Sequence, residues 1–467
     1  MHFEEPSAPA PPGDGPWYKQ LNRYHWFVLA VCSLGWLFDT MDQQLFNLAR
    51  PAAMRELIPD VGKTSPEDAK ELKAKRDFNG GLATMIFMIG WASGGLFFGV
   101  LGDRIGRAKT MLLTILIYSV CTGLSALSVG VYDFAFYRFL TGLGVGGEFA
   151  AGVSLVAEVM PDRARPFALG VLQALSAVGN MMAACVGIGL ALMIRAGYLE
   201  SSWRVMFLIG TAPALLCIPI FRRLKEPDKW KAVAKTEEVS GERRLGSISE
   251  LFSDPRWRRN AIVGMLLAFS GVVGLWGIGF FSFDLVSSIF RKRYIEQGLP
   301  PREVEFWVSF WVAVTSLLQN FGAFLGVYAF SYVTHHVGRK PAFFVTFILA
   351  MASTAFTFWF LDDVTDIFWM IPIMGFCQIA LFGGYAIYFP ELFPTRLRST
   401  GTSFCYNVGR LVAAFGPLTL GYLSAAVFSG RQYESFRYAG VAMCSFFLIG
   451  LLALPFAPET KGKPLPE

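Results

Sequence analysis

The feature that most limits how this chain can fold is a series of twelve apolar runs. A membrane helix needs about 20 mainly apolar residues. Charged residues make up 16% of the 467-residue chain, whereas a soluble domain has about 25%. We therefore expect an all-α membrane protein with twelve transmembrane helices. The runs lie near residues 24–49, 79–101, 109–128, 132–157, 166–193, 204–221, 260–283, 306–333, 341–361, 364–389, 399–428 and 436–457.

An eight-residue phrase, E-x-x-P-x-R-x-R, occurs twice in the chain. It begins at Glu158 and again at Glu391, half the chain length later, and it ends at Arg165 and Arg398. Each copy lies between two apolar runs, so we expect two pseudo-symmetric six-helix bundles in the same orientation. Small residues four apart favour close helix packing in lipid. Two further pairs recur at almost the same separation: Gly90-x-x-x-Gly94 with Gly322-x-x-x-Gly326, and Gly106-Arg107 with Gly338-Arg339.

The positions of Lys and Arg predict the orientation. Nine Lys or Arg residues lie on four short connections at one side of the membrane, and eleven more lie within 222–259. The connections near 129–131 and 362–363, at the opposite side, carry none. Because cytoplasmic loops carry the excess of Lys and Arg, both termini should be cytoplasmic in a multi-pass protein of the plasma or inner membrane. Seven basic residues within 50–77 oppose this assignment, although six acids accompany them.

We accordingly divide the chain into five parts. They are a disordered cytoplasmic tail (1–22), an N-terminal bundle (23–221) with an external loop (50–77), a cytoplasmic linker (222–259), a C-terminal bundle (260–457) and a cytoplasmic tail (458–467).

Several functional classes lack support. The net charge of +6 falls on loops, so nothing favours nucleic-acid binding. The seven cysteines lie within apolar runs without C-x-x-C spacing, and no metal-ligand cluster, nucleophile elbow or phosphate loop is present. We expect neither an enzyme nor a cofactor, so that transport would depend on an ion gradient. A channel would not need two linked halves, but a sensor with a transporter fold remains an alternative.

The segment after the second apolar run reads Gly102-Asp103-Arg104-Ile-Gly106-Arg107-Ala-Lys109. It resembles the G-D-R-x-G-R-R loop of the major facilitator superfamily, with Ala108 in place of the last arginine. The resemblance covers essentially the whole chain and implies that this loop, with Glu158, Arg165, Glu391 and Arg398, gates one end. The second copy has Thr334, His335 and His336 in place of Gly102, Asp103 and Arg104. Alternatively, such loops serve only as positive-inside anchors.

Other motifs narrow the resemblance. Arg138-x-x-x-Gly142-x-Gly-x-Gly146-Gly147-Glu148 and Pro458-Glu459-Thr460-Lys461-Gly462 resemble the group of sugar porters, organic-ion transporters and carboxylate symporters. Trp203-Arg204 and Glu226-Pro-Asp-Lys-Trp230 are most similar to the sialate and lactate proton symporters. The residues at 271–284 lack the glutamine pair and asparagine of sugar porters, which argues against a hexose.

Ionisable residues at membrane depth are functional candidates, because each costs roughly 2.5–3.5 kcal/mol at a helix centre. Asp39 and Asp42 share one helix face. Two carboxylates this close cannot both ionise cheaply, so one should hold a proton. Their D-x-x-D pattern resembles that of aromatic-acid symporters. We assign them, with Glu148, to proton coupling, although Asp39 and Asp42 could instead face water or pair with arginine, and Glu148 could be a packing carboxylate.

Arg410 lies near the middle of its helix, three residues after Asn407. A guanidinium there can hold a carboxylate bidentately, or it can pair with an acid of another helix. Arg138 has a counterpart in the superfamily that is linked to proton transfer or substrate charge. The remaining predicted substrate-binding residues are Gln173, Asn180 and Tyr385, whose alternative roles are helix packing and hydrogen bonding between helices.

These observations predict a secondary transporter that works by alternating access and takes up a small organic anion, such as a monocarboxylate, sialate or aromatic acid, with protons. It should act as a monomer in the lipid bilayer. The alternative is a proton-coupled sugar, polyol or organic-cation transporter. A sensor remains the third possibility.

Overall fold

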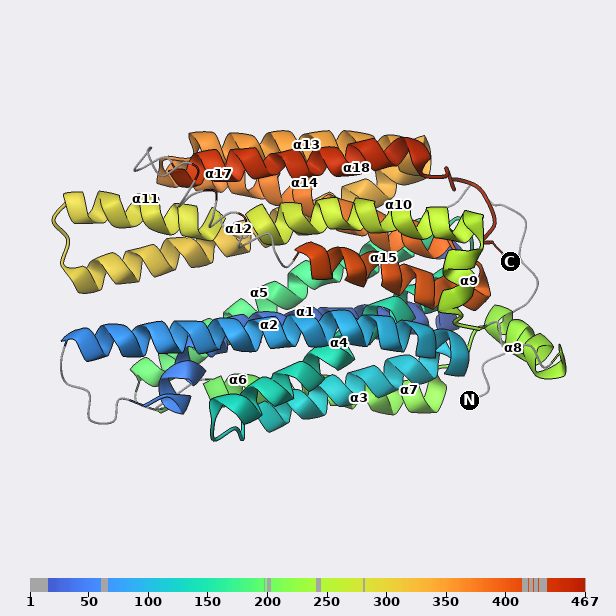
Figure 1. Ribbon diagram of the computed structural model, residues 1–467, viewed down its shortest axis with the longest axis horizontal. Coiled ribbons are helices and arrows are strands. Elements are labelled where there is room, and N and C mark those ends of the chain that lie inside the picture. The colour runs from blue at the N-terminus through green and yellow to red at the C-terminus, as the bar shows by residue number, and fades with distance from the viewer. Residues whose placement is uncertain are drawn as a thin grey trace.

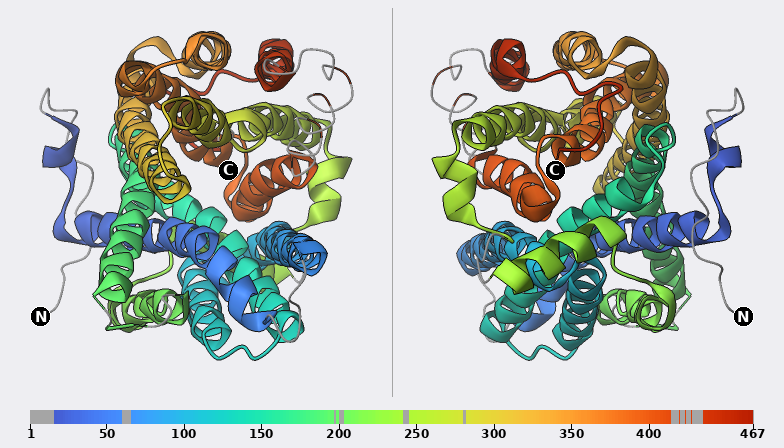
Figure 2. Two further views of the ribbon diagram at one scale, coloured as in Figure 1. Left: turned by 90° about the vertical axis from the view of Figure 1, so that its left-hand side faces the viewer. Right: turned by 90° about the vertical axis from the view of Figure 1, so that its right-hand side faces the viewer.

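The computed structural model is a long helical bundle whose helices run mostly along one axis (Figure 1). It describes residues 16–59, 66–196, 198–199, 203–240, 245–279, 282–413, 419, 423, 427 and 435–466. The predicted disordered tail lies mostly outside this part of the chain. Seen from either end, the early helices form one bundle and the late helices form a second beside it (Figure 2).

The N-terminal bundle follows the short helix η1 (Trp17–Gln20). Its first helix is capped by Asn22, whose side chain accepts the backbone N–H of His25. The sixth membrane helix is interrupted near Pro213 by a 3₁₀ turn. The helices are α1 (Arg23–Leu57), α2 (Pro66–Ile105), α3 (Arg107–Ser125), α4 (Val131–Val159), α5 (Arg165–Arg195), α6 (Trp203–Ile209), η2 (Ala212–Leu216) and α7 (Cys217–Arg223).

The linker contains α8 (Asp228–Ser240) and α9 (Ile248–Ser253). The C-terminal bundle then begins at Pro255, after the N-cap Asp254. Its helices are α10 (Pro255–Val272), the π-helical turn η3 (Val273–Ile278), α11 (Ser282–Glu296), α12 (Pro301–Val337), α13 (Arg339–Phe360), α14 (Val364–Glu391), η5 (Thr395–Leu397), α15 (Arg398–Ala413), α17 (Ser435–Met443), η7 (Cys444–Phe446), α18 (Phe447–Ala453) and η8 (Leu454–Phe456).

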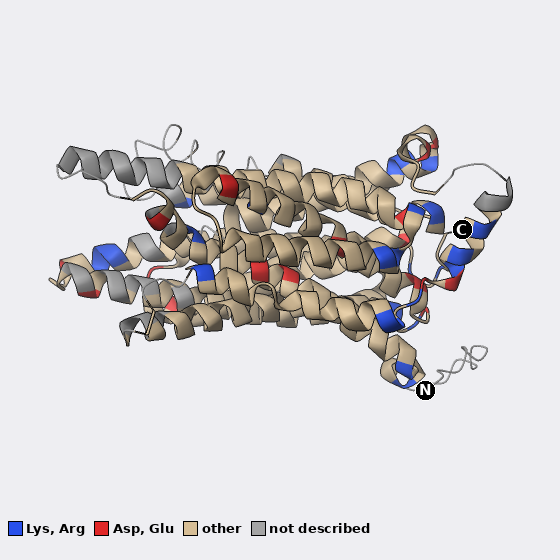
Figure 3. Ribbon diagram, turned by 90° about the horizontal axis from the view of Figure 1, so that it is seen from below, with Lys and Arg blue, Asp and Glu red and all other residues tan. Residues whose placement is uncertain are grey.

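Ten helices of the described chain are long and apolar enough to cross a membrane. Most charged residues lie toward the two ends of the molecule (Figure 3). We call the end with α8 and α9 the linker end, at the right of Figure 1. Glycines at this end close the turns into α3 and α13, where Gly106 and Gly338 have φ values of 112° and 105°.

Much of the predicted external loop at 50–77 is helical. The first helix does not stop before Pro51 but continues to Leu57, where Glu56 accepts hydrogen bonds from Trp203 Nε1 (2.6 Å) and Arg204 Nη2 (2.8 Å). Residues 66–77 form the start of α2. Forty residues of helix span about 60 Å, so α2 projects beyond a hydrocarbon core of about 30 Å.

The repeated G-x-x-x-G pairs bring helices close together, as predicted. A Cβ added to Gly94 would lie 2.1 Å from the Leu143 carbonyl oxygen of α4, and one on Gly326 would lie 2.1 Å from the Phe376 oxygen of α14. Only glycine allows this approach. The α2–α4 and α12–α14 pairs therefore pack alike in the two bundles.

Candidate functional site

A small pocket of about 70 Å³ lies between the two bundles. Both bundles contribute to it, and several of its walls are amide side chains. Of the residues that line this pocket, Arg410 alone carries a charge. The lining residues are Trp36, Thr40, Gln43, Gln44, Asn47, Trp91, Gln173, Ser176, Ala177, Asn180, Leu275, Trp276, Gln319, Asn320, Ala323, Ile379, Phe382, Tyr406 and Arg410.

Arg410 is held on α15 by aromatic rings. Its guanidinium carbon lies 3.8 Å from the centre of the Trp91 ring and 4.5 Å from that of Tyr406. The side chain is 3% exposed, and its Nε and Nη1 atoms have no hydrogen-bond partner among the described residues. Stacking fixes the plane of a guanidinium but leaves its N–H groups free. The site therefore presents a buried cation with donors available to a ligand.

Asp39 and Glu148 are also buried without partners. Both carboxyl oxygens of each lack a hydrogen-bond partner in the described chain. Glu148 lies against α1 because Gly35, one turn before Asp39, has no side chain: a Cβ there would be 2.4 Å from Glu148 Oε1. Asp39 interacts electrostatically with both Glu148 and Arg410. A buried carboxyl without a partner is costly when ionised, so these groups suit reversible protonation.

Asp42 and Arg138 have a different environment. Arg138 Nη1 lies 3.6 Å from Asp42 Oδ2, while Thr122 donates to Asp42 Oδ1 at 2.8 Å. Arg138 also donates to Ser125 and Thr141, and neither member of the ion pair lines the pocket. The structure thus separates the two aspartates, which sequence reasoning had grouped. Asp42 belongs to a fully buried ion pair within the N-terminal bundle.

Of the other predicted binding residues, some line the pocket and others do not. Gln173 and Asn180 line the pocket, and Asn180 donates to Asn320 of the other bundle at 3.1 Å. Tyr385 does not line it, since its hydroxyl donates to the Leu267 carbonyl at 2.6 Å. Asn407 lies between the bundles, against Gly95 of α2, and donates to Ser403.

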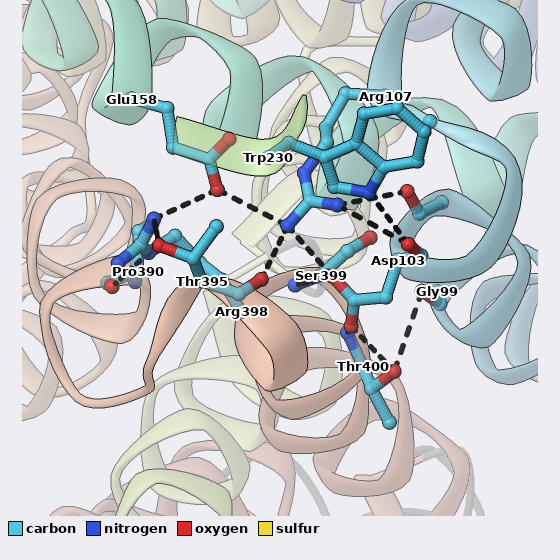
Figure 4. Close-up of polar contacts among 12 residues, drawn as sticks. Gly99, Asp103, Arg107, Glu158, Trp230, Pro390, Thr395, Arg398, Ser399 and Thr400 are labelled. Carbon is cyan, nitrogen blue, oxygen red and sulfur yellow. Dashed lines mark hydrogen bonds and ion pairs between the residues drawn. The ribbon is translucent and has the colours of Figure 1, made fainter. Parts of the chain in front are cut away.

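Four of the predicted gating residues, Asp103, Arg107, Glu158 and Arg398, meet at the linker end (Figure 4). Asp103, on α2, accepts hydrogen bonds from the backbone N–H groups of Ser399 (3.1 Å) and Thr400 (2.8 Å) and from the Thr400 hydroxyl (2.7 Å). These N–H groups belong to the first turn of α15, where a helix favours a negative charge. A side chain of one bundle thereby caps a helix of the other.

Glu158 joins arginines of both bundles. Its Oε1 lies 3.1 Å from Arg107 Nη2 and 2.7 Å from Arg398 Nη1, and Arg107 also pairs with Asp103 at 2.9 Å (Figure 4). All four side chains are fully buried. We call Asp103, Arg107, Glu158, Arg398 and Thr400 the linker-end cluster. It holds the two bundles together at this end.

Glu391, the equivalent of Glu158 in the second copy of the motif, bonds within its own bundle. Arg339 donates to both oxygens of Glu391, at 3.0 and 2.8 Å. Arg165 bonds to the Ala157 carbonyl at 2.9 Å and pairs with Asp162. Arg104 is exposed, so it lies outside the linker-end cluster.

Sequence reasoning missed two residues that the repeat could have identified. Glu226 accepts the backbone N–H groups of Ala108 and Lys109 at the start of α3. Glu459 is its equivalent in the repeat and accepts those of Arg339 and Lys340 at the start of α13. Each carboxylate caps the helix that follows a positive-φ glycine. The aromatic residues around Arg410 were also missed, because sequence spacing does not show which faces of α2 and α15 meet.

Comparison with known proteins agrees with this architecture. The family model of the Major Facilitator Superfamily matches residues 32–417. A probable 4-methylmuconolactone transporter from Cupriavidus pinatubonensis is 27% identical over 96% of this chain and 93% of its own, and a cis,cis-muconate transport protein from Acinetobacter baylyi is 27% identical over 84% and 89%. The solved structure of a proton:xylose symporter with a bound bromo-glucose superposes with a TM-score of 0.71 at 17% identity, covering 95% and 98%.

The fold and the comparisons define the class of protein as a membrane transporter rather than an enzyme, which confirms the prediction. The chain belongs to the major facilitator superfamily. Its twelve-helix fold of two pseudo-symmetric bundles is likewise confirmed.

Proposed function

We propose that the protein is a proton-coupled symporter that takes up a small organic anion. The observation that carries this proposal is Arg410, the one charged residue lining the described pocket, which is buried and has hydrogen-bond donors to spare. A buried cation attracts a carboxylate strongly, since bidentate charge-assisted hydrogen bonds are the strongest available to a side chain. The relative named for cis,cis-muconate, a carboxylate, supports the same substrate class.

The aromatic side chains around the pocket suit the apolar body of such an anion. Trp36, Trp276 and Phe382 line the same space as Arg410. In this conformation the pocket measures about 70 Å³, well below the ~300–1,000 Å³ of ordinary small-molecule sites. The substrate must therefore enter a conformation in which the bundles lie further apart. The structure corresponds to a contracted state of the transport cycle.

Asp39 and Glu148 are the proposed proton carriers. Protonation of Asp39 removes a buried negative charge that acts on Arg410, so that the guanidinium attracts a substrate carboxylate more strongly. Proton and anion thus bind in the same conformation. Asp42 is left out of this role because it forms an ion pair with Arg138 and accepts a hydrogen bond from Thr122.

The linker end is proposed to face the cytoplasm, as the Lys and Arg residues of its short connections require. The linker-end cluster then closes the inner gate, and its separation opens the route inward. The transporter is proposed to reside in the cell membrane, to work as a monomer and to need no cofactor beyond the proton gradient.

The test is the external pH of energy-depleted cells in weak buffer after addition of candidate substrates. Organic acids such as muconate and benzoate should cause alkalinisation that is absent in control cells. Arg410→Ala should abolish it, whereas Arg256→Ala, which changes an exposed arginine at the linker end, should not. A response to acids that survives Arg410→Ala would refute the assigned anion site.

A second experiment isolates the proton. Asp39→Asn should abolish uphill uptake of the radiolabelled acid while leaving counterflow exchange, because exchange needs no net proton movement. Asp39→Glu is the matched control that keeps a titrating group. Uphill uptake by Asp39→Asn at the parent rate would exclude Asp39 as a proton carrier.

One feature favours a second candidate, a proton-coupled sugar or polyol transporter. The pocket wall carries seven amide side chains, which can bind neutral hydroxyl groups: Gln43, Gln44, Asn47, Gln173, Asn180, Gln319 and Asn320. Alkalinisation by sugars alone, in the same assay, would establish this alternative and make Arg410 structural.

A further inference from the structure

The two bundles meet along two related seams at the linker end. One seam joins α2 to α15, and the other joins α12 to α5. In the repeat, α12 corresponds to α2 and α5 corresponds to α15. The first seam ends in the contact between Asp103 and Thr400. In the second seam, the repeat places His335 at the position of Asp103 and Phe167 at the position of Thr400.

Phe167 and His335 are in contact at this equivalent place. Their ring centres lie 5.0 Å apart with the planes at 50°. Phe167 is the third residue of α5, just as Thr400 is the third residue of α15. The acid and hydroxyl of the first seam are therefore replaced by two aromatic rings, although the helices meet in the same register.

The register continues deeper into both seams. A Cβ on Gly99 would lie 2.5 Å from Ser403 Cβ, and at the equivalent positions a Cβ on Gly170 would overlap the Ser331 hydroxyl. Glycine and serine have exchanged helices between the seams, but the close contact is kept. The match at two successive levels shows that the Phe167–His335 contact occupies the place of the Asp103–Thr400 contact.

The N-terminal segment adds a third ring. Trp17, in η1, stacks on Phe167 with centres 5.6 Å apart and planes only 5° from parallel. Trp17 is partly exposed, whereas Phe167 is 8% exposed. One aromatic column thus joins the segment before the first membrane helix to α5 of the N-terminal bundle and α12 of the C-terminal bundle.

We propose that Trp17, Phe167 and His335 form a second, aromatic gate contact that holds the α5–α12 seam closed at the linker end. This inference rests on the proposed alternating-access function, and it assigns a role in gating to the N-terminal segment. The segment 334–336 lacks the acidic residue of the first copy. It lies at the equivalent place in the gate and makes an aromatic contact there instead of an acidic one. Opening this seam separates rings rather than ions, so it does not leave a buried charge.

The cationic groups around His335 allow a test of whether the aromatic contact replaces the acidic contact of the first seam. Arg163, His336, Arg339 and Lys461 all act electrostatically on it. A carboxylate at position 335 would be attracted by these groups and could cap the first turn of α5 if residue 167 were threonine. The double variant His335→Asp/Phe167→Thr would therefore rebuild the part of the acidic contact that uses the backbone N–H and hydroxyl of residue 167, since Pro166, at the place of Ser399, has no N–H.

The experiment measures access to the seam in purified protein in lipid nanodiscs. Ser331→Cys places a thiol in the closed seam, and the rate of its reaction with a polar maleimide reports opening. The same chain without Ser331→Cys provides the background from the seven native cysteines. Phe167→Ala should raise the rate by about twofold to tenfold, the effect of losing an aromatic contact, and Trp17→Ala should raise it less.

Phe221→Ala is the matched control, because Phe221 is a 79% exposed ring on α7 at the same end. His335→Asp/Phe167→Thr should return the rate to the parent value, whereas Phe167→Thr alone should not. Trp17→Ala keeps the test valid if Phe167→Ala fails to fold. Unchanged labelling in folded Phe167→Ala and Trp17→Ala, or a double variant as open as Phe167→Thr, would overturn the proposal.

Labelling needs neither substrate nor a proton gradient. A change in labelling together with failed anion uptake would therefore count against the proposed substrate while supporting the aromatic gate contact. Normal anion uptake with unchanged labelling would count against the gate contact alone.

Discussion

Glu158 and Glu391 occupy equivalent places in the two bundles, yet they have different second partners. Each binds the arginine that follows the positive-φ glycine, Arg107 or Arg339. Glu158 also binds Arg398 of the other bundle at 2.7 Å. Glu391 instead accepts the hydroxyl of Thr460, in the C-terminal tail of its own bundle, at 2.6 Å.

This difference indicates that the two repeats have kept the same local structure more strictly than they have kept the same contacts between bundles. Arg165 and Arg398 both bond to the carbonyl eight residues earlier, at 2.9 and 3.1 Å. Both arginines therefore begin their helices in the same way. Across the seam the two arginines differ, because Arg398 pairs with Glu158 of the other bundle, whereas Arg165 pairs with Asp162 of its own bundle. The linker adds to the contacts of the first seam, since Trp230 donates to the Asp103 carbonyl at 2.6 Å.

The largest difference in stability is expected between the variants Glu158→Gln and Glu391→Gln. Removing Glu158 leaves buried Arg398 without its carboxylate partner and Arg107 with Asp103 alone, and it breaks an ion pair between the bundles, whereas removing Glu391 breaks a pair within one bundle. Breaking a buried ion pair costs roughly 3–5 kcal/mol, so Glu158→Gln should lower the thermal unfolding temperature more and should open the linker end. Unfolding of the purified variants and maleimide labelling at that end provide the measurements. Equal losses in both variants would contradict the asymmetry.

Asp103→Asn should have a smaller effect on the first seam. The asparagine keeps the size of the side chain but loses the charge that the α15 N-terminus and Arg107 favour, a loss of roughly 1–3 kcal/mol. The thermal unfolding temperature should fall measurably. His335→Asn at the equivalent place in the second seam should cost less, because only a ring contact is lost there. A larger loss for His335→Asn would reverse the ranking of the two seams.

The N-terminal bundle has a buried carboxylate at Glu148, whereas the second bundle has Leu381 at the equivalent position. The variant Gly35→Ala tests how the N-terminal bundle positions this carboxylate. The added methyl would displace Glu148 from α1. If Glu148 takes part in proton coupling, the pH profile of anion uptake should shift while counterflow exchange is kept. The control is Gly189→Ala, since a Cβ at Gly189 has open space. A uniform loss of activity at every pH would indicate a packing defect only.

Much of this arrangement could be predicted from sequence, because apolar length and repeat spacing are local properties. The twelve runs, the two bundles and the packing of the repeated glycines follow from them. The roles of Asp39 and Asp42 could not be separated, since their difference depends on how α1 is rotated toward Arg138 on α4. The extent of α1 and α2 was also misjudged, because the apolar runs end near residue 49 and begin again near residue 79, whereas α1 continues to Leu57 and α2 begins at Pro66.

The smallest effect on stability is expected for changes to the two glutamates that cap α3 and α13. Burial alone would raise the pKa of Glu459, but hydrogen bonds from the backbone N–H groups of Arg339, Lys340, Lys461 and Thr460 hold this pKa below its ordinary value of 4.5. Because the pKa is lower in the folded state, the stabilisation is complete above pH 4.5 and is lost as the pH falls through the folded-state pKa.

Glu459→Gln should therefore be less stable than the parent at neutral pH, and the difference should shrink as the medium is acidified below pH 4.5. Glu459 is partly exposed, so the effect should remain under about 1 kcal/mol. Thermal unfolding temperatures of the two proteins between pH 6 and pH 3 provide the measurement. Glu226→Gln removes the equivalent cap of α3 and shows at neutral pH how much a cap of this kind contributes in the first bundle. A gap between the parent and Glu459→Gln that stays constant with pH would mean that the carboxylate charge contributes nothing and that shape alone holds the C-terminal tail against α13.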